Sequence, residues 1–286
     1  MDVTDLFSAA SNGDCEKIHS LLEKGTDVDA KDDHGCTALH HAARVGHCPA
    51  MEVLLDSGLG VDTTDLEGRT ALHYASEAGH CGTMKLLLNR GADVGATDHK
   101  KETALHQAAK YSHCAAITLL LDRGAHVNMA NSEHQSALHL AASRVINQSS
   151  VIRNVVGCAW FMDTQLLEAL QYSAKGRREA VALLLDRGAW VDALDHWEYT
   201  PLHYAAFEAD TDTILLLLDR GADFHSVNRL SQSLLHIAAF RGHNAAVNMW
   251  LDHGLDINAR DTTGRTGNSE VTVFLRWWLS GCKGQT

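Results

Sequence analysis

The sequence is poor in proline, in basic side chains and in long apolar runs. Only two prolines occur among 286 residues and no Pro/Ser-rich stretch is present, so no linker divides the chain. Lys and Arg number 24 against 36 Asp and Glu, a net charge of −12, which argues against a nucleic-acid-binding surface and against electrostatic docking on anionic membranes. No stretch approaches the roughly 18 uncharged apolar residues of a membrane-spanning helix.

The N-terminal residues and the cysteines both indicate a reducing compartment. Residues 1–5 are acidic and lack the layout of a signal peptide, so we expect a cytoplasmic or nuclear protein. Four of the seven cysteines recur at one constant spacing, at Cys15, Cys48, Cys81 and Cys114. Equivalent residues of stacked repeats lie ~8–10 Å apart, which exceeds the ~7 Å that a disulfide can span between Cα atoms. The spacing therefore predicts free thiols.

A four-residue motif, Thr-Ala-Leu-His in its clearest copies, organises the chain. It begins at Thr70 and recurs with small changes at Thr37, Thr103, Ser136, Thr200 and Ser233. The steps between successive copies are identical, except that the step from Ser136 to Thr200 is nearly twice as long. A fixed period of roughly 20–50 residues is typical of proteins built from stacked repeats.

Each residue of the motif has a physical role at the start of a helix. The Ser or Thr can cap the helix, because its oxygen accepts a free backbone N–H. Pro201 stands at a first helical position, where proline is favoured, and Ala in the other copies is a good helix former. The Leu is expected to face the core. We expect the His to bond the capping hydroxyl with one ring nitrogen and a neighbouring backbone carbonyl with the other.

The full repeat unit resembles the ankyrin repeat family. The unit from Thr103 to Ala125 carries most of the resemblance: the motif, then Ala108-Ala109, then Leu119 to Ala125 with the sequence Leu-Leu-Leu-Asp-Arg-Gly-Ala. The resemblance implies an all-α fold of helix pairs joined by short hairpin links. It predicts one solenoid domain over residues 1–286, with about 8–9 repeats.

The regularity of the repeats varies along this predicted domain. Residues 4–135 and 176–265 contain regular repeats, and residues 266–286 form an irregular end with an abbreviated last repeat. The long step between Ser136 and Thr200 has two interpretations: an insertion at about residues 144–174, or two degenerate repeats. We prefer the second interpretation, with a degenerate segment at about residues 136–175, because Ala169–Tyr172 resembles Ala71–Tyr74.

The many histidines and aspartates are expected to be structural. Histidines number 19, but ligands of a zinc site must converge at ~2.0–2.3 Å from the ion, whereas equivalent repeat positions lie a helix spacing apart. Asp32, Asp65, Asp98, Asp195 and Asp261 share one hairpin position, which suggests that they cap turns. We predict no catalytic residue, no metal site and no cofactor.

The resemblance implies a non-catalytic module or scaffold that binds a protein partner on its concave face and hairpin tips. The acidic surface is compatible with a basic partner, and we expect a monomer. The alternatives are a substrate adaptor of a ubiquitin ligase and a targeting or regulatory fragment of a larger enzyme or channel. No C-terminal box that resembles the ligase-recruiting one is apparent, which weighs against the adaptor.

The partner-binding residues are expected where the repeats differ. Aromatic side chains are 6% of the chain, yet five lie between residues 190 and 207. Trp, Tyr and Arg are the residues most enriched at interface hot spots. The candidates are Trp190, Trp197, Tyr199, Tyr204, Phe207, Arg229 and Leu230, with Leu66, Glu67, His99 and Lys100 at the N-terminal tips as the alternative.

Some ankyrin repeats are hydroxylated at an Asn of the hairpin that follows a Val and lies eight residues past a Leu. Leu120, Val127 and Asn128 match this spacing. Asn258 matches less well, because Trp250 stands at the Leu position. The resemblance therefore makes Asn128 a candidate for hydroxylation.

Overall fold

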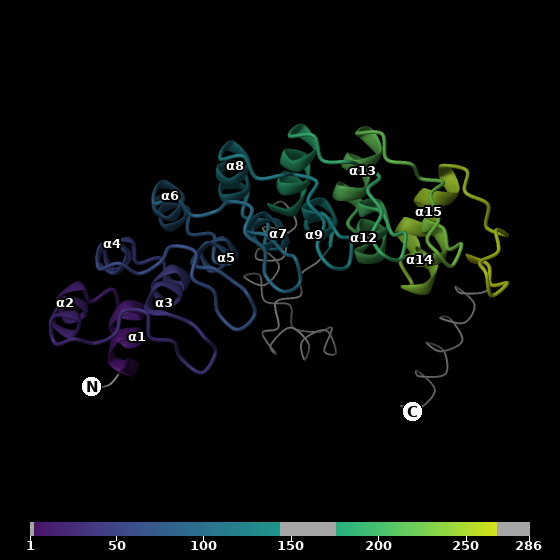
Figure 1. The fold of residues 1–286 in the computed structure, drawn as a ribbon. Coiled ribbons are helices and arrows are strands. Elements are labelled where there is room, and N and C mark those ends of the chain that lie inside the picture. The colour runs from purple at the N-terminus through teal and green to yellow at the C-terminus, as the bar shows by residue number, and fades with distance from the viewer. Residues whose placement is uncertain (1–2, 144–175, 268–286) are drawn as a thin grey trace, which may run out of the picture. The chain divides into compact units, whose positions relative to one another are not determined.

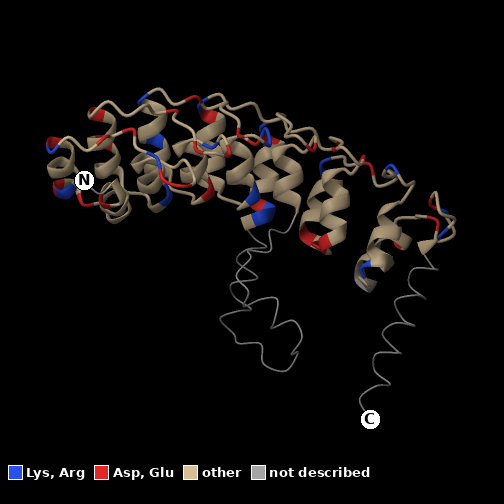
Figure 2. Cartoon of the chain, turned by 60° about the horizontal axis from the view of Figure 1, so that its bottom comes forward, with Lys and Arg blue, Asp and Glu red and all other residues tan. Residues whose placement is uncertain are grey.

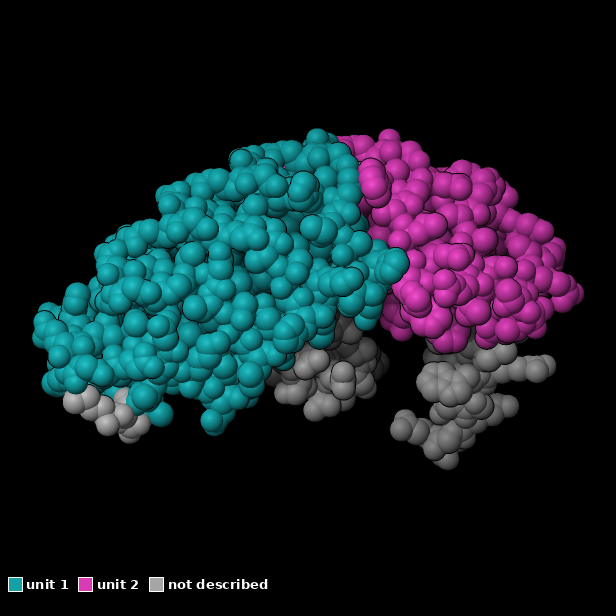
Figure 3. Space-filling model, viewed as in Figure 1, with its two compact units in different colours: residues 1–137, 186–188 teal, residues 138–185, 189–286 magenta. Residues whose placement is uncertain are grey.

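The computed structural model describes residues 3–143 and 176–267, which fold into helices joined by turns and hairpins (Figure 1). They belong to two compact units (Figure 3). Unit 1 comprises residues 1–137 and 186–188, and unit 2 comprises residues 138–185 and 189–286. Among the described residues the only extended pairing is a set of isolated bridges, such as that between Thr97 and Thr103. The predicted all-α repeat fold is confirmed. That the whole chain forms a single domain stays a prediction.

Each regular repeat consists of two antiparallel helices. The first helices are α1 (Val3–Asn12), α3 (Ala38–Val45), α5 (Ala71–Glu77), α7 (Ala104–Lys110), α9 (Ala137–Ala142), α12 (Pro201–Glu208) and α14 (Leu234–Phe240). The second helices are α2 (Cys15–Glu23), α4 (Cys48–Asp56), α6 (Cys81–Asn89), α8 (Cys114–Asp122), residues 176–186, α13 (Thr211–Asp219) and α15 (Asn244–Asp252).

The helices of unit 1 stack in two layers. Helices α1, α3, α5 and α7 contact one another in order and form one layer, while α2, α4, α6 and α8 form the other. The first helices are buried on most sides, and the exposed fraction of Ala71, Leu72 and Ala75 is at most 1%. Small alanines let these helices approach closely, and the second helices add one apolar face, represented by Met84 and Leu87. In unit 2, α12 packs against α14 in the same way.

The turn between the two helices of a repeat requires a left-handed backbone. Gly79 has a φ of +71°, and a Cβ there would lie 2.7 Å from Nδ1 of His113. The turn histidine of one repeat therefore packs on the turn glycine of the preceding repeat, which explains the recurring Gly-His pair. His113 Nε2 bonds the Glu77 carbonyl oxygen at 3.0 Å. In unit 2, Arg177 and Asp210 occupy the histidine position and form a buried ion pair instead.

The hairpins between repeats are joined edge to edge by backbone hydrogen bonds at their tips. In unit 1, Leu66 N–H donates to the His34 carbonyl at 3.0 Å, and His99 N–H donates to the Glu67 carbonyl at 2.8 Å. In unit 2, Arg229 N–H donates to the Trp197 carbonyl at 3.0 Å. These bonds hold neighbouring tips in a fixed row within each unit.

The packing around the long step favours the insertion, against the preferred prediction of two degenerate repeats. A motif histidine elsewhere bonds a carbonyl 29 residues ahead, as His106 does with Gln135, but His139 Nε2 bonds the Tyr199 carbonyl 60 residues ahead. In unit 1, Arg187 pairs with Asp122 at 2.8 Å across 65 residues, where the equivalent Arg90–Asp56 pair spans 34. Both contacts pass over the same additional length of chain, so α9 and residues 176–186 form the two helices of one repeat. Residues 144–175 themselves lie outside the described part of the chain.

Thr4 and Thr266 lie one repeat period before the first motif copy and one period after the last. Thr4 lies inside α1 rather than capping it, which fits the absence of the motif histidine in that repeat. Thr266 pairs with Arg260 in an isolated bridge, as the repeat period requires. The irregular segment beyond residue 267 lies outside the described residues. Within the described chain Cys15, Cys48, Cys81 and Cys114 form no disulfide, as their spacing predicted, and neither does Cys36.

Candidate functional site

The motif threonine and histidine together fix the start of each first helix. Thr70 N–H donates to His73 Nδ1 at 3.1 Å, and the Thr70 hydroxyl lies 3.0 Å from the same nitrogen. His73 Nε2 lies 3.0 Å from the Glu102 carbonyl oxygen of the next hairpin. Because Nδ1 accepts the backbone N–H, the ring proton is on Nε2 and is donated to that carbonyl. Both bonds expected from the sequence are confirmed at His73, and the ring nitrogens of His40, His106, His139 and His236 also bond a carbonyl of the next hairpin. His203 Nε2 is buried without such a partner.

These histidines are neutral parts of the scaffold. Burial lowers the pKa of His40, His73 and His106 in unit 1. Burial lowers the pKa of His203 in unit 2 to about 4. A neutral imidazole can satisfy the N–H donor and the carbonyl acceptor at once, whereas an imidazolium cannot accept a hydrogen bond. The rings therefore serve stability rather than proton transfer.

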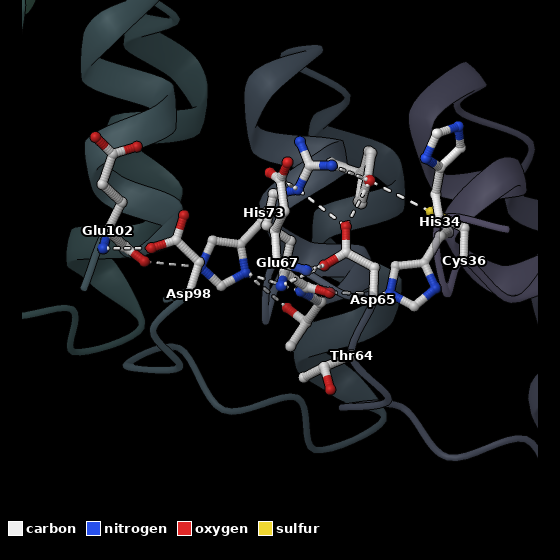
Figure 4. A network of polar contacts seen from close by, with 12 residues as sticks. His34, Cys36, Thr64, Asp65, Glu67, His73, Asp98 and Glu102 are labelled. Atoms are coloured by element: carbon white, nitrogen blue, oxygen red, sulfur yellow. Dashed lines mark hydrogen bonds and ion pairs between the residues drawn. The ribbon is translucent and has the colours of Figure 1, made fainter. Parts of the chain in front are cut away.

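In several hairpins an aspartate forms the centre of a polar network, and Asn131 and Asn228 take its place in two others. Figure 4 shows Asp65 of unit 1, whose Oδ1 accepts the backbone N–H groups of Glu67 at 2.8 Å and Arg69 at 2.9 Å. Its Oδ2 accepts the Tyr74 hydroxyl at 2.8 Å and Arg69 Nε at 3.0 Å. Burial alone would raise the pKa of Asp65, but these hydrogen bonds outweigh it and hold the pKa below its usual value. The aspartate stabilises the turn, as its repeated position indicates.

Cys36 and Tyr74 complete this network without chemical activation. Cys36 Sγ lies 3.4 Å from the Tyr74 hydroxyl, and both side chains are buried. Burial raises the pKa of the Cys36 thiol, and burial with the hydrogen bonds to Cys36 and Asp65 raises the pKa of Tyr74. A protonated thiol is a poor nucleophile. The network therefore has the properties of a structural contact.

The described residues lack two further kinds of feature. No group of three or more His, Cys, Asp or Glu side chains in the described chain is placed to hold a metal ion. None of the described helices has the length and apolar character needed to cross a membrane. Figure 2 shows that acidic and basic positions are interspersed along the loops and helix ends.

The predicted tip residues of unit 2 are accessible. Trp197 is 57% exposed and Leu230 is 46% exposed, and their hairpins are neighbours through the bond from Arg229 N–H to the Trp197 carbonyl. Arg229 Nε lies 3.7 Å from Glu198 Oε1, a contact between two half-exposed side chains. Trp190 is also exposed, but it lies in the turn after the second helix, away in sequence from the hairpin tip.

The other aromatic candidates are partly engaged by the fold. The Tyr204 hydroxyl donates to Asp195 Oδ2 at 2.8 Å, and the Tyr199 ring packs against His203 with centroids 5.5 Å apart. Both tyrosines are half-buried, so truncating either would disturb the hairpin. Phe207 is 38% exposed, and the Arg241 guanidinium lies over its ring, 4.2 Å from the centroid.

Sequence reasoning missed Phe240 and Arg241. Phe240 is 63% exposed at the end of α14 and follows Phe207 by one repeat period. The sequence holds a signal for Phe240. Among the six motif copies named above, the seventh residue after the threonine or serine is aromatic only in the last two, where it is Phe207 and Phe240. Arg241 had no such signal, since only the structure brings it over Phe207.

The alternative candidates at the N-terminal tips occupy a more polar row in unit 1. Leu66 is exposed, Glu67 Oε2 lies 3.4 Å from Arg69 Nε, and the Lys100 carbonyl accepts Ser132 N–H at 2.7 Å. His99 packs against Gly68, where a Cβ would lie 2.8 Å from its ring. In the same unit, the Asn128 side-chain amide donates to the Gly188 carbonyl at 3.1 Å.

Comparisons with known proteins agree with this geometry. A family model for three copies of the ankyrin repeat matches residues 6–98, 145–228 and 166–261, and a model for many copies matches residues 87–141. The crystal structure of the human ASB11 ankyrin repeat domain resembles the chain with a TM-score of 0.67 and 24% identity, covering 86% of this chain and 96% of that one. At this identity the likeness concerns the fold alone. The comparison with curated proteins returned no match. The family matches extend over most of the sequence, so this chain belongs to the ankyrin repeat family, whose repeats are generally protein–protein interaction modules.

Proposed function

We propose that this chain is a non-catalytic interaction module whose protein partner docks on an apolar strip of unit 2. The strip comprises Trp197 and Leu230 at two neighbouring hairpin tips, and Phe207 and Phe240 at the ends of α12 and α14. One observation carries the proposal: the repeats of α12 and α14 both expose an apolar side chain at the hairpin tip and another at the end of the first helix. Helix α12, about 12 Å long, separates the two rows and bears the half-buried Tyr204 between them.

Unit 1 shows that the repeat does not need apolar residues at these positions. Its tips carry His34, Glu67, Lys100 and Glu133 in place of Trp197 and Leu230. Its first helices carry Arg44, Glu77 and Lys110 where unit 2 has Phe207 and Phe240. Both sets sit on the same capped helices, so the apolar residues of unit 2 have no evident role in the fold. An exposed apolar patch surrounded by polar residues is typical of an interaction site.

The strip also has the composition expected of an energetic hot spot. A few residues account for most binding energy at interfaces, Trp is among the types most enriched there, and removing one such residue costs ~2 kcal/mol or more. The tip row is held by backbone hydrogen bonds, and the helix-end row lies on rigid capped helices. A partner would therefore meet a surface that loses little conformational entropy on binding.

The test compares the strip with the same repeat positions in unit 1. Trp197→Ala with Phe240→Ala removes one anchor from each row, and Glu67→Ala with Lys110→Ala is the matched control. Proteins captured by the wild-type chain are first identified, and the amount of each that the two double variants capture is then measured. Dissociation constants are then measured with the partner that the strip variant loses. We expect the strip variant to lower affinity at least ~30-fold, about 2 kcal/mol, with an unchanged melting temperature.

The control variant should bind as tightly as the wild-type chain. Full binding by the strip variant would overturn the proposal, as would a loss of binding that follows a loosened fold. If only the unit 1 control loses the partner, the binding surface is the N-terminal row with Leu66, Glu67, His99 and Lys100.

A further inference from the structure

Arg241 is held beside the apolar strip in a position suited to an anionic group. Its guanidinium lies over the Phe207 ring, 4.2 Å from the centroid, and bridges α14 and α12. It directly follows Phe240, the most exposed residue of the strip, and Arg241 is itself exposed. Stacking on a ring covers the flat face of a guanidinium and leaves the N–H donors at its edge available.

The charge of Arg241 has no carboxylate partner within the described residues. Several other exposed arginines of the two units do have one: Arg90 pairs with Asp56, Arg187 with Asp122 and Arg229 with Glu198. Arg241 makes its described contacts through the Phe207 ring and its own helix backbone. An arginine that is fixed in position but unpaired can form a two-pronged hydrogen bond with an incoming carboxylate at little entropic cost.

The repeat fold does not require an arginine at this position. The equivalent described residues are Asn12, Val45, Ala78 and Tyr111 in unit 1 and Glu208 in unit 2, while Arg144 shares the position but lies outside the described residues. The fold therefore accepts an apolar, an aromatic or an acidic residue there. Within the described chain a basic residue is present only where two exposed phenylalanines adjoin it, so the cation and the apolar surface form one local feature.

We propose that the strip recognises a partner segment in which an acidic residue lies within two positions of a large apolar residue. The carboxylate bonds Arg241 while the apolar side chain packs on Phe207 and Phe240. This inference rests on the proposed function, because it names the chemistry of the partner at the same surface. The net charge of −12 repels a strongly acidic partner, so a single carboxylate is expected rather than an acidic run.

A charge exchange tests this inference. The full chain is immobilised and used to select binders from a random peptide display library, and the selected peptides are synthesised for affinity measurements. We expect them to contain Asp or Glu within two positions of Phe, Leu, Ile or Trp. Arg241→Gln should weaken these peptides about 10-fold, the loss of one charge-assisted contact. Arg241→Glu should restore binding to peptides in which the acid is replaced by Lys.

Arg220→Gln is the matched control in the same unit. It lies at the C-terminal end of α13, and because α13 runs antiparallel to α12, this end is remote from Phe207. It should leave peptide affinity unchanged. Selected peptides that depend on Trp197 and Phe240 but lack an acid and tolerate Arg241→Gln would overturn this inference and leave the proposed function standing. Peptides that ignore the strip altogether would overturn both.

Discussion

The two units share one scaffold and differ in what they expose on it. Thr70 N–H and Thr200 N–H donate to His73 Nδ1 and His203 Nδ1 at the same 3.1 Å, so the helix starts are equivalent. The tips and first-helix ends are charged or polar in unit 1, apart from Leu66, and apolar in the repeats of unit 2 that begin with α12 and α14. The comparison separates residues that build the repeat from residues that the repeat leaves free to vary. Function is most readily found among the second group.

The largest effect on stability is expected from a substitution in the turn between the two helices of a repeat, where the two units differ. Unit 1 has histidines such as His80 at this turn, whereas two turns of unit 2 hold the buried Arg177–Asp210 ion pair and a third keeps a histidine, His243. Asp210→Ala would leave Arg177 buried without a partner and would also remove the cap that accepts Thr213 N–H. We expect a loss of about 3–5 kcal/mol in the free energy of unfolding.

Chemical denaturation measures this loss, with Asp212→Ala, an exposed acid on the same helix, as the control. His80→Ala in unit 1 should cost about 1 kcal/mol, because removing a half-buried ring leaves no buried charge behind. Equal losses for Asp210→Ala and His80→Ala would show that the ion pair is not a special feature of unit 2.

Acidification should weaken the scaffold that both units share. The pKa of His203 falls from 6.5 to about 4 on folding, so the unfolded state binds the proton first. The stability that this group contributes is fully present above pH 6.5 and is lost as the pH falls towards 4, about 3 kcal/mol in all. Lowered pKa values of His40, His73 and His106 add losses of the same sign in unit 1.

Denaturation curves between pH 7.5 and 4 check this prediction. His203→Asn should flatten the pH dependence, whereas His19→Gln, which changes an exposed histidine of α2, should leave it unchanged. A free energy of unfolding that is constant over this range would contradict the neutral, buried state of the motif histidines.

A smaller effect is expected from shortening the chain between α9 and residues 176–186. Removing residues 145–175 joins Arg144 to Gly176 and restores the regular step between Ser136 and Thr200. Because the described contacts already join the flanking repeats, we expect the melting temperature to change by only a few degrees, corresponding to less than about 1 kcal/mol. A loss of several kcal/mol would show that the removed segment supplies a repeat of its own and its interfaces.

The smallest effect concerns modification rather than stability. We propose that Asn128 of unit 1 is accepted by an asparaginyl hydroxylase in preference to Asn258 of unit 2. The Asn128 side chain bonds the Gly188 carbonyl, and Trp250 fills the Leu position before Asn258. After co-expression with an active enzyme, peptide mass spectrometry should find an added oxygen on Asn128 alone. Only unmodified Asn128 peptide, beside a modified reference substrate, would remove this proposal.

Much of the fold could be predicted from local sequence because each repeat depends on short-range rules. The capping residue, the small alanines and the turn glycine act within a few residues of one another. The period then implies the bond from each histidine to the next hairpin. The candidate surface was found in part, since Trp197, Phe207 and Leu230 stand out against their counterparts in other repeats.

What the sequence by itself determined is the repeat, its helix starts and the structural role of its motif histidines. Only the tertiary structure decided which partner each hairpin residue takes. Oδ2 of Asp65 bonds Tyr74, whereas Asn131 bonds Gln135 at 3.2 Å and Asn228 bonds Gln232 at 3.0 Å, where the residue matching Tyr74 is Leu140 or Ile237.

Tertiary packing likewise stacked Arg241 on Phe207 and paired Arg187 with Asp122 rather than with a residue of a further repeat. The physical reason is common to these cases. A cap or a period is a contact between residues at a fixed sequence distance, so it can be read from the chain. A contact between neighbouring repeats depends on which repeats become neighbours. Here additional residues separate two repeats that are neighbours in space, so the sequence distance between contacting residues is not the regular one and could not be predicted.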